Sequence, residues 1–157
     1  MEIRDTTFGS APSYSLEIVL ETTSADDLTR FKKVCIAVSI LENLYTIYGI
    51  DESHLKSSNE DGSTINLRTE NALIVSPFNE FKTVFVECLN TVKSLFSNYK
   101  IVPVAISAMT IEGLQVRYLD KLTGVTIYNA LFNQFLEFRN LKNLLGEKSF
   151  GYTDWEL

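Results

Sequence analysis

Apolar and polar residues alternate from Tyr14 to Thr22. Successive side chains of a strand point to opposite faces, so this alternation predicts a half-buried strand. Its apolar face consists of Leu16, Ile18 and Leu20. In this interpretation Glu17 and Glu21 share the other face, which is polar except at its centre.

The next segment predicts a helix from Ser24 to Tyr48. Its apolar positions recur three and four residues apart, at Leu28, Phe31, Val34, Cys35, Val38, Leu41, Tyr45 and Tyr48. Asp27, three residues after Ser24, approximates a capping box, and Gly49 is typical of the residue that follows a helix. Residues 51–63 are polar and predict a loop, which carries His54, the only histidine.

The same two periodicities predict the remaining elements. Strands are expected over 64–68, 72–75, 101–108 and 114–119, and helices over 77–98 and 124–145. Ser76-Pro77 is a typical helix start, and Gly146 is a typical helix end.

The predicted order is β-α-β-β-α-β-β-α, which indicates a two-layer α+β domain with an antiparallel sheet and helices on one face. The first six elements match a ferredoxin-like arrangement, to which a strand and a C-terminal helix are added. We expect a single domain over residues 1–157. It has a loose N-terminal arm at 1–13 and a tail at 147–157 that is aromatic and acidic.

Composition supports a globular domain, because 45% of the 157 residues are hydrophobic and 22% are charged. The net charge of −6 disfavours nucleic acid and anionic lipid as partners. The N-terminus shows no secretory signal, and no stretch of about 18 apolar residues occurs. We therefore expect a cytoplasmic protein with no membrane partner.

Few residues offer chemistry. One histidine and two cysteines do not supply the four ligands of a structural zinc site, and the glycines form no phosphate-binding loop. We assign no catalytic residue, metal or cofactor. Glu17, Glu21 and Glu112 leave open a small enzyme or ligand-binding domain that uses buried carboxylates.

Two features indicate an interaction surface. The predicted third helix carries more large apolar residues than one sheet face would cover, and Phe132 and Leu136 lie to one side of its main row. The tail contains Phe150, Tyr152 and Trp155, and tyrosine and tryptophan are frequent interface anchors. These five residues are the predicted partner-binding residues, and a homodimer is the favoured assembly.

The function we expect is that of a non-catalytic, acidic protein-binding domain that inhibits, neutralises or escorts another protein. Immunity proteins, secretion chaperones and viral anti-defence proteins are analogous in size and charge. An acidic surface favours a basic partner. Two alternatives stay open, namely the small enzyme or ligand-binding domain and a structural component of a larger assembly.

Overall fold

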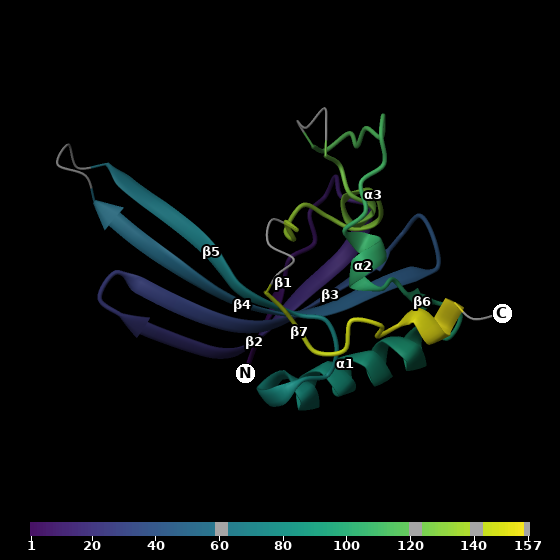
Figure 1. The fold of residues 1–157 in the computed structure, drawn as a ribbon, viewed down its shortest axis with the longest axis horizontal. Helices are drawn as coiled ribbons and strands as arrows, with labels where there is room; N and C mark the ends of the chain where they lie inside the picture. Colours follow the sequence, from purple (N-terminus) through teal and green to yellow (C-terminus); the bar gives the residue numbers. More distant parts are fainter. Residues whose placement is uncertain (59–62, 120–123, 139–142, 156–157) are drawn as a thin grey trace.

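The computed structural model describes residues 1–58, 63–119, 124–138 and 143–155. It is an α+β fold built on one mostly antiparallel sheet (Figure 1). Four long strands lie side by side in chain order: β2 (Ser13–Ala25), β3 (Leu28–Ser39), β4 (Leu44–Ser58) and β5 (Thr64–Ile74). The short strand β1 (Glu2–Asp5) pairs with the outer edge of β2.

Two short strands from the C-terminal half add parallel pairs to this sheet. β6 (Lys100–Ile101) pairs with the start of β4, and β7 (Leu144–Leu145) pairs with the end of β5. Both β6 and β7 lie at the end of the sheet that the helices cover (Figure 1). Among the described residues, the C-terminal half therefore extends the sheet at that end.

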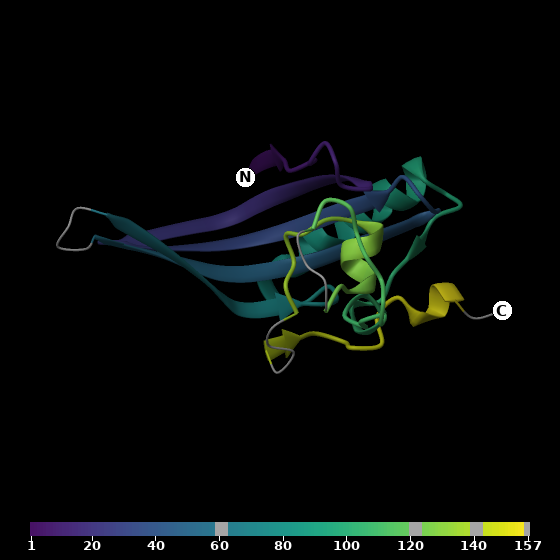
Figure 2. The same cartoon turned by 90° about the horizontal axis from the view of Figure 1, so that it is seen from above.

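Helical segments cover both faces of that end, whereas the sequence predicted helices on one face (Figures 1 and 2). The turn η1 (Asn79–Phe81) leads into α1 (Lys82–Leu95), which packs against one face. The short helices α2 (Val104–Ser107) and α3 (Ile127–Leu131) lie over the opposite face, and η3 (Tyr152–Trp155) is the last described element.

Each face has its own hydrophobic core. The core under α1 includes Val34, Ile47 and Phe85. The core under α3 includes Ala37, Tyr48, Tyr128 and Phe132. Because side chains alternate along a strand, β3 and β4 supply apolar residues to both cores.

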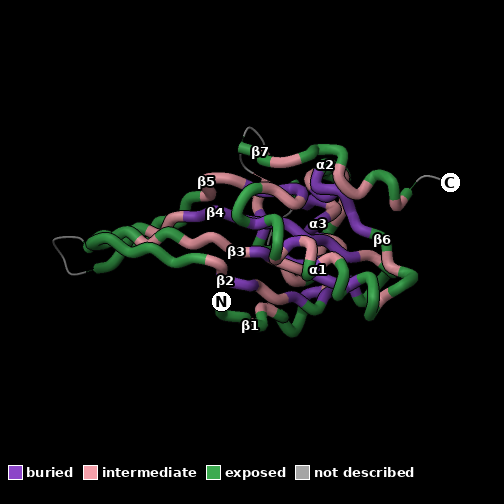
Figure 3. Tube along the Cα trace, turned by 90° about the horizontal axis from the view of Figure 1, so that it is seen from below, coloured by how far each residue is buried: buried purple, intermediate pink, exposed green. Residues whose placement is uncertain are grey.

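The same strands continue beyond the helices. We call the covered end the body, and we call the described residues 21–31, 53–58 and 64–69 the arm (Figure 3). Along β4 the residues from Tyr45 to Glu52 are all buried, and those from Leu55 to Ser58 are all exposed.

The predicted helix over 24–48 is wrong. This segment contains the end of β2, all of β3 and the start of β4. In the body, both faces of these strands are buried, so apolar residues occupy nearly every position and imitate a helical stripe. A turn at Asp26, whose φ is 49°, begins the segment in place of a helix cap.

The predicted polar loop is also wrong over Asp51–Ser58, which belongs to β4. It looks like a loop because the strand emerges from the body there and becomes polar. Residues 59–62 lie outside the described residues. The N-terminal arm predicted at 1–13 contains β1, which pairs with β2, so it is ordered at Glu2–Asp5.

Among the described residues of the predicted third helix over 124–145, the α-helix spans Ile127–Leu131. Buried amides replace the helical hydrogen bonds beyond it. The Asn129 side chain donates to the Asn133 carbonyl, and the Asn133 side chain accepts from the Phe135 N–H. Residues 120–123 and 139–142 lie outside the described residues.

The predicted hairpin over 101–108 and 114–119 does not form. Pro103 follows β6 and begins α2, and residues 114–119 are irregular. The strand predicted over Tyr14–Thr22 is confirmed within β2, and the helix predicted over 77–98 is confirmed as η1 and α1. The predicted order, and with it the ferredoxin-like topology, is not the one observed.

Candidate functional site

A pocket of about 230 Å³ opens on the α3 face of the sheet, where the body meets the arm. Strands β2 to β5 form its floor, and Asn133 and Phe135 from the segment after α3 form a wall. Charged side chains dominate the arm side of the pocket, and Tyr48 and Cys35 lie on its body side.

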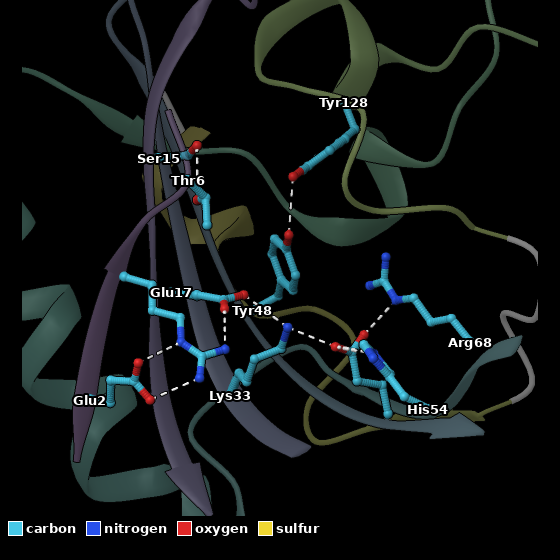
Figure 4. A network of polar contacts seen from close by, with 11 residues as sticks. Glu2, Thr6, Ser15, Glu17, Lys33, Tyr48, His54, Arg68 and Tyr128 are labelled. Atoms are coloured by element: carbon cyan, nitrogen blue, oxygen red, sulfur yellow. Dashed lines mark hydrogen bonds and ion pairs between the residues drawn. The ribbon is translucent and has the colours of Figure 1, made fainter. Parts of the chain in front are cut away.

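A chain of alternating charges crosses the sheet beside this pocket (Figure 4). Glu17 Oε2 lies 2.8 Å from Lys33 Nζ, which lies 2.7 Å from Glu52 Oε1. Glu52 Oε2 accepts from Arg68 Nε at 2.6 Å, and His54 Nε2 lies 3.0 Å from Glu52 Oε1. We call these five residues the charged ladder; each long strand contributes to it.

The ladder continues to the outer edge of the sheet. Arg4 in β1 lies 3.4 Å from Glu17 and 2.8 Å from Glu2. Arg4 stands opposite Glu17 in the register of β1 and β2, and His54 stands opposite Arg68 in that of β4 and β5. Strand pairing therefore places the opposite charges of Arg4 and Glu17 as cross-strand neighbours. It also places His54 beside Arg68, and both side chains contact Glu52.

Glu52 is the centre of the ladder, and its side chain is 1% exposed. Burial alone would raise the pKa of its carboxyl, but Lys33 and Arg68 outweigh burial and lower that pKa below its ordinary value of 4.5. Burial would lower the pKa of Lys33, whereas its bonds to Glu17 and Glu52 raise it. Both groups are therefore charged at neutral pH.

On the body side, hydroxyl groups replace charges. The Tyr48 and Tyr128 hydroxyls lie 3.1 Å apart, and the Tyr128 hydroxyl donates to Asn133 Oδ1 at 2.7 Å. Burial raises the pKa of the Cys35 thiol to about 12 and that of Tyr48 well above 10. At neutral pH the pocket thus contains a protonated thiol, protonated phenols and ion-paired carboxylates.

The three carboxylates singled out from the sequence do not converge. A β-bulge between Val19 and Glu21 reverses the alternation, so Glu17 pairs with Lys33 and Glu21 pairs with Lys32 on the opposite face. Glu112 is exposed and lies outside the pocket. Sequence reasoning missed Glu52, because its segment was interpreted as a loop; alternation of Glu52 and His54 with Ser53 was the available signal.

The opposite face of the arm is apolar at its centre. Leu28, Leu55 and Leu67 stand directly opposite one another on β3, β4 and β5, beyond the end of α1. They are 43%, 40% and 54% exposed, and Ile65, one position further along the same face of β5, is 42% exposed. We call Leu28, Leu55 and Leu67 the leucine row.

The structure separates the five predicted partner-binding residues. Phe132 is fully buried and Leu136 is 2% exposed, because both pack on the α3 face of the sheet. Neither side chain is available to a partner in this conformation. These two large side chains fill the hydrophobic core on the α3 face, and the helix predicted for this segment did not place them there.

The tail packs against its own domain. Phe150 makes an edge-to-face contact with Phe85 of α1, with ring centroids 5.6 Å apart. Trp155 Nε1 donates to the Ile101 carbonyl at 2.7 Å, and Lys100 lies over the Trp155 ring. Tyr152 stays 40% exposed and Trp155 39% exposed, so only their outer surfaces could contact a partner.

Within the described ranges, no helix is long and apolar enough to span a membrane. In the same part of the chain, no group of three or more His, Cys, Asp or Glu residues lies close enough together to hold a metal ion. The chain matches no known protein family, curated protein or solved structure.

Proposed function

We propose that this chain is a non-catalytic protein-binding domain and that the arm is its contact surface. The leucine row carries this proposal. Contiguous exposed apolar side chains are uncommon on a monomer and are typical of interaction sites. The proposed activity is inhibition, neutralisation or escort of a cytoplasmic partner, and the net charge of −6 favours a partner with a basic surface.

The shape of the arm supports this proposal. It projects from the body, so a partner can reach its α1 face without displacing α1 (Figure 1). On the opposite face the charged ladder joins the arm to the body, because Arg68 of the arm is bonded to Glu52, which Lys33 and Glu17 continue across the sheet. A rigid surface loses less conformational entropy when it binds a partner.

The test compares two exposed leucines at opposite ends of the sheet. Leu55 lies in the leucine row, and Leu41 is 61% exposed in the turn between β3 and β4. The wild-type chain, Leu55→Ser and Leu41→Ser are immobilised and used to capture proteins from the source cells. We expect a partner that the wild type and Leu41→Ser retain and Leu55→Ser loses. Equal capture by all three, or no stable partner, refutes the proposal.

The pocket supports a second candidate, a ligand-binding domain. Arg68 and His54 line the pocket and remain 44% and 42% exposed at their side chains. The ion-paired carboxylates beside them do not favour acid–base catalysis. A small-molecule library screened by thermal shift would favour this candidate if a compound stabilises the wild type and not Arg68→Gln.

A homodimer also belongs to the proposal, but its contact surface differs from the one the sequence predicts. The sequence predicts a dimer contact at Phe132 and Leu136, and the fold buries both residues. A structural component of a larger assembly is the third class, and it requires larger oligomers than a dimer. Mass photometry of the wild-type chain distinguishes the two.

A further inference from the structure

The outer edge of β5 is open along the arm. β7 pairs with β5 only at Leu73 and Ile74, and the described residues place no other strand beside Thr64–Thr69. We call Thr64–Thr69 the open edge. All six of its residues are exposed. It has no proline, and its one charge, Arg68, is bonded to Glu52. Natural sheets usually block such an edge with charges, proline or bulges.

The hydrogen-bonding direction of the open edge follows from the neighbouring strand. The Lys56 N–H donates to the Asp27 carbonyl at 2.9 Å, so Lys56 directs its backbone groups toward β3. Backbone direction alternates along a strand, so Leu55 and its partner Leu67 bond to each other. Asn66 and Arg68 therefore direct their N–H and C=O groups outward.

We propose that the open edge pairs antiparallel with the open edge of a second copy, with the two-fold axis at Leu67. This inference specifies the homodimer named under the proposed function and depends on that part of it. Leu67 then faces its own copy, Asn66 faces the second copy's Arg68, and Thr64 faces its Glu70. Outward-directed groups meet one another in the last two pairs, and each such pair exchanges two N–H···O bonds.

The charges and apolar side chains favour this register. A shift of one pair toward the C-terminus would place Arg68 opposite Arg68, which is unfavourable. A shift the other way would leave Glu70 outside the pairing and shorten the ladder. In the proposed register the leucine row of one copy continues into that of the other, so the dimer presents one apolar strip across both arms. The two-fold contact also closes on itself, so it does not extend into a fibre.

Single cysteine variants test the register. Leu67 faces Leu67 of the second copy across the two-fold axis, and because its backbone groups point toward β4 the two residues form a non-hydrogen-bonded pair. The Cα atoms of such a pair lie about 4.5 Å apart, within the range of a disulfide. We expect Leu67→Cys to form a covalent dimer on mild oxidation. Thr69→Cys and Ile65→Cys, the matched controls, should not crosslink alone but should crosslink when mixed. The two native cysteines lie away from the open edge, Cys35 against the α3-face core and Cys88 buried in α1, so the wild-type chain is the control that should not crosslink.

Three substitutions at Asn66 test the association itself. Asn66→Pro removes an outward N–H, a change that edge strands tolerate, so it should abolish the dimer and leave thermal unfolding of the monomer unchanged. Asn66→Lys places a second positive charge opposite Arg68 and should raise the dimer Kd roughly tenfold. Asn66→Glu should lower the Kd.

The controls keep the two proposals separate. A monomer at high micromolar concentration in sedimentation, or crosslinking through Asn66→Cys in place of Leu67→Cys, overturns the proposed dimer. Capture of a partner that depends on Leu55 would still support the protein-binding function, because Leu55 lies within the sheet face and not on the open edge.

Discussion

The body and the arm are built from the same four strands, yet they are stabilised in different ways. In the body, α1 covers one face of the sheet and α3 covers the other, and the strands are apolar on both faces. In the arm neither face is covered (Figure 3). On the α3 face, Arg68 and His54 of the arm bond to Glu52 at the edge of the body, and on the α1 face the leucine row is apolar and exposed.

The difference shows where apolar surface and backbone hydrogen-bonding groups are left without a partner. The body buries its large side chains and satisfies its buried amides, so its stability is internal. The charged ladder, where the body meets the arm, is likewise satisfied, because Glu52 bonds to Lys33 of the body and to Arg68 of the arm. Among the described residues, the body leaves two buried hydroxyls, of Tyr45 and Ser107, without a hydrogen-bond partner. On the surface, the apolar face of the arm and the open edge of β5 lack a counterpart among these residues, and both of our proposals concern them.

The largest expected effect contrasts one side chain from each region. Phe132→Ala should lower the free energy of unfolding by about 4 kcal/mol, because it leaves a cavity under a fully buried ring. Leu55→Ala should cost less than about 1 kcal/mol, since that side chain is 40% exposed. Urea denaturation of both variants, at a concentration where the wild type is monomeric, measures the difference. Similar losses would mean that the arm is packed as tightly as the body.

The second effect tests whether the ladder depends on its buried member. Glu52→Gln should lower the free energy of unfolding by about 3 kcal/mol, because it leaves Lys33 and Arg68 without their shared carboxylate. Glu21→Gln is the matched control on the other face, where the carboxylate is 54% exposed and pairs with Lys32. We expect little change there. Comparable losses would contradict the central place given to Glu52.

The sequence predicted β2 and α1 well, and the reason is that each has one buried face. Leu16 and Ile18 alternate with polar residues, and α1 buries only Phe85, Cys88 and Val92 as a stripe. The sequence prediction failed where a strand is buried on both faces or on neither. Within Val34–Tyr48 the strands carry apolar residues on both faces, so the pattern imitates a helix. Asp51–Ser58 is polar because no helix covers the arm, so it was interpreted as a loop.

The candidate site was less predictable than the fold, because it depends on register. Lys33 and Glu52 come from strands that the sequence interpreted as helix and loop. The β-bulge that places Glu17 and Glu21 on opposite faces of the sheet cannot be recognised from the residues around it. Phe150 and Trp155, which the sequence marked as partner-binding residues, contact Phe85 and Ile101 of their own domain, a packing that depends on the tertiary fold.

The third effect is a pH dependence of the free energy of unfolding. Glu52 and Glu70, on neighbouring strands, contribute to it with opposite signs. A carboxyl with a lowered pKa in the folded state stabilises the fold above its unfolded pKa, and this stability is lost as pH falls through the folded pKa. Glu52 is such a group, so stability should fall as the pH drops below about 4.5. Burial raises the pKa of Glu70 above 4.5, so protonation of Glu70 stabilises the fold as the pH falls toward about 4.5, before the loss from Glu52 begins.

Substitution separates these two contributions. Glu52→Gln should make the loss of stability below about pH 4.5 shallower, and Glu70→Gln should remove the gain expected as the pH falls toward about 4.5. Free energies of unfolding measured between pH 6 and pH 3 provide the comparison. A Glu52→Gln profile as steep as that of the wild type would mean that other carboxylates, such as Asp51 beside Arg30, control acid unfolding.

The smallest effect concerns His54, at the exposed end of the ladder. Its ring contacts Glu52 at 3.0 Å and Phe31 edge-on, with centroids 5.0 Å apart, while its side chain stays 42% exposed. Glu52 keeps Lys33 and Arg68 when His54 is removed, so His54→Ala should cost less than about 1 kcal/mol at pH 7. A double-mutant cycle with Glu52→Gln should give a coupling below about 0.5 kcal/mol. A coupling several times larger would show that the ladder acts as one cooperative unit, in which the exposed histidine is as necessary as the buried glutamate.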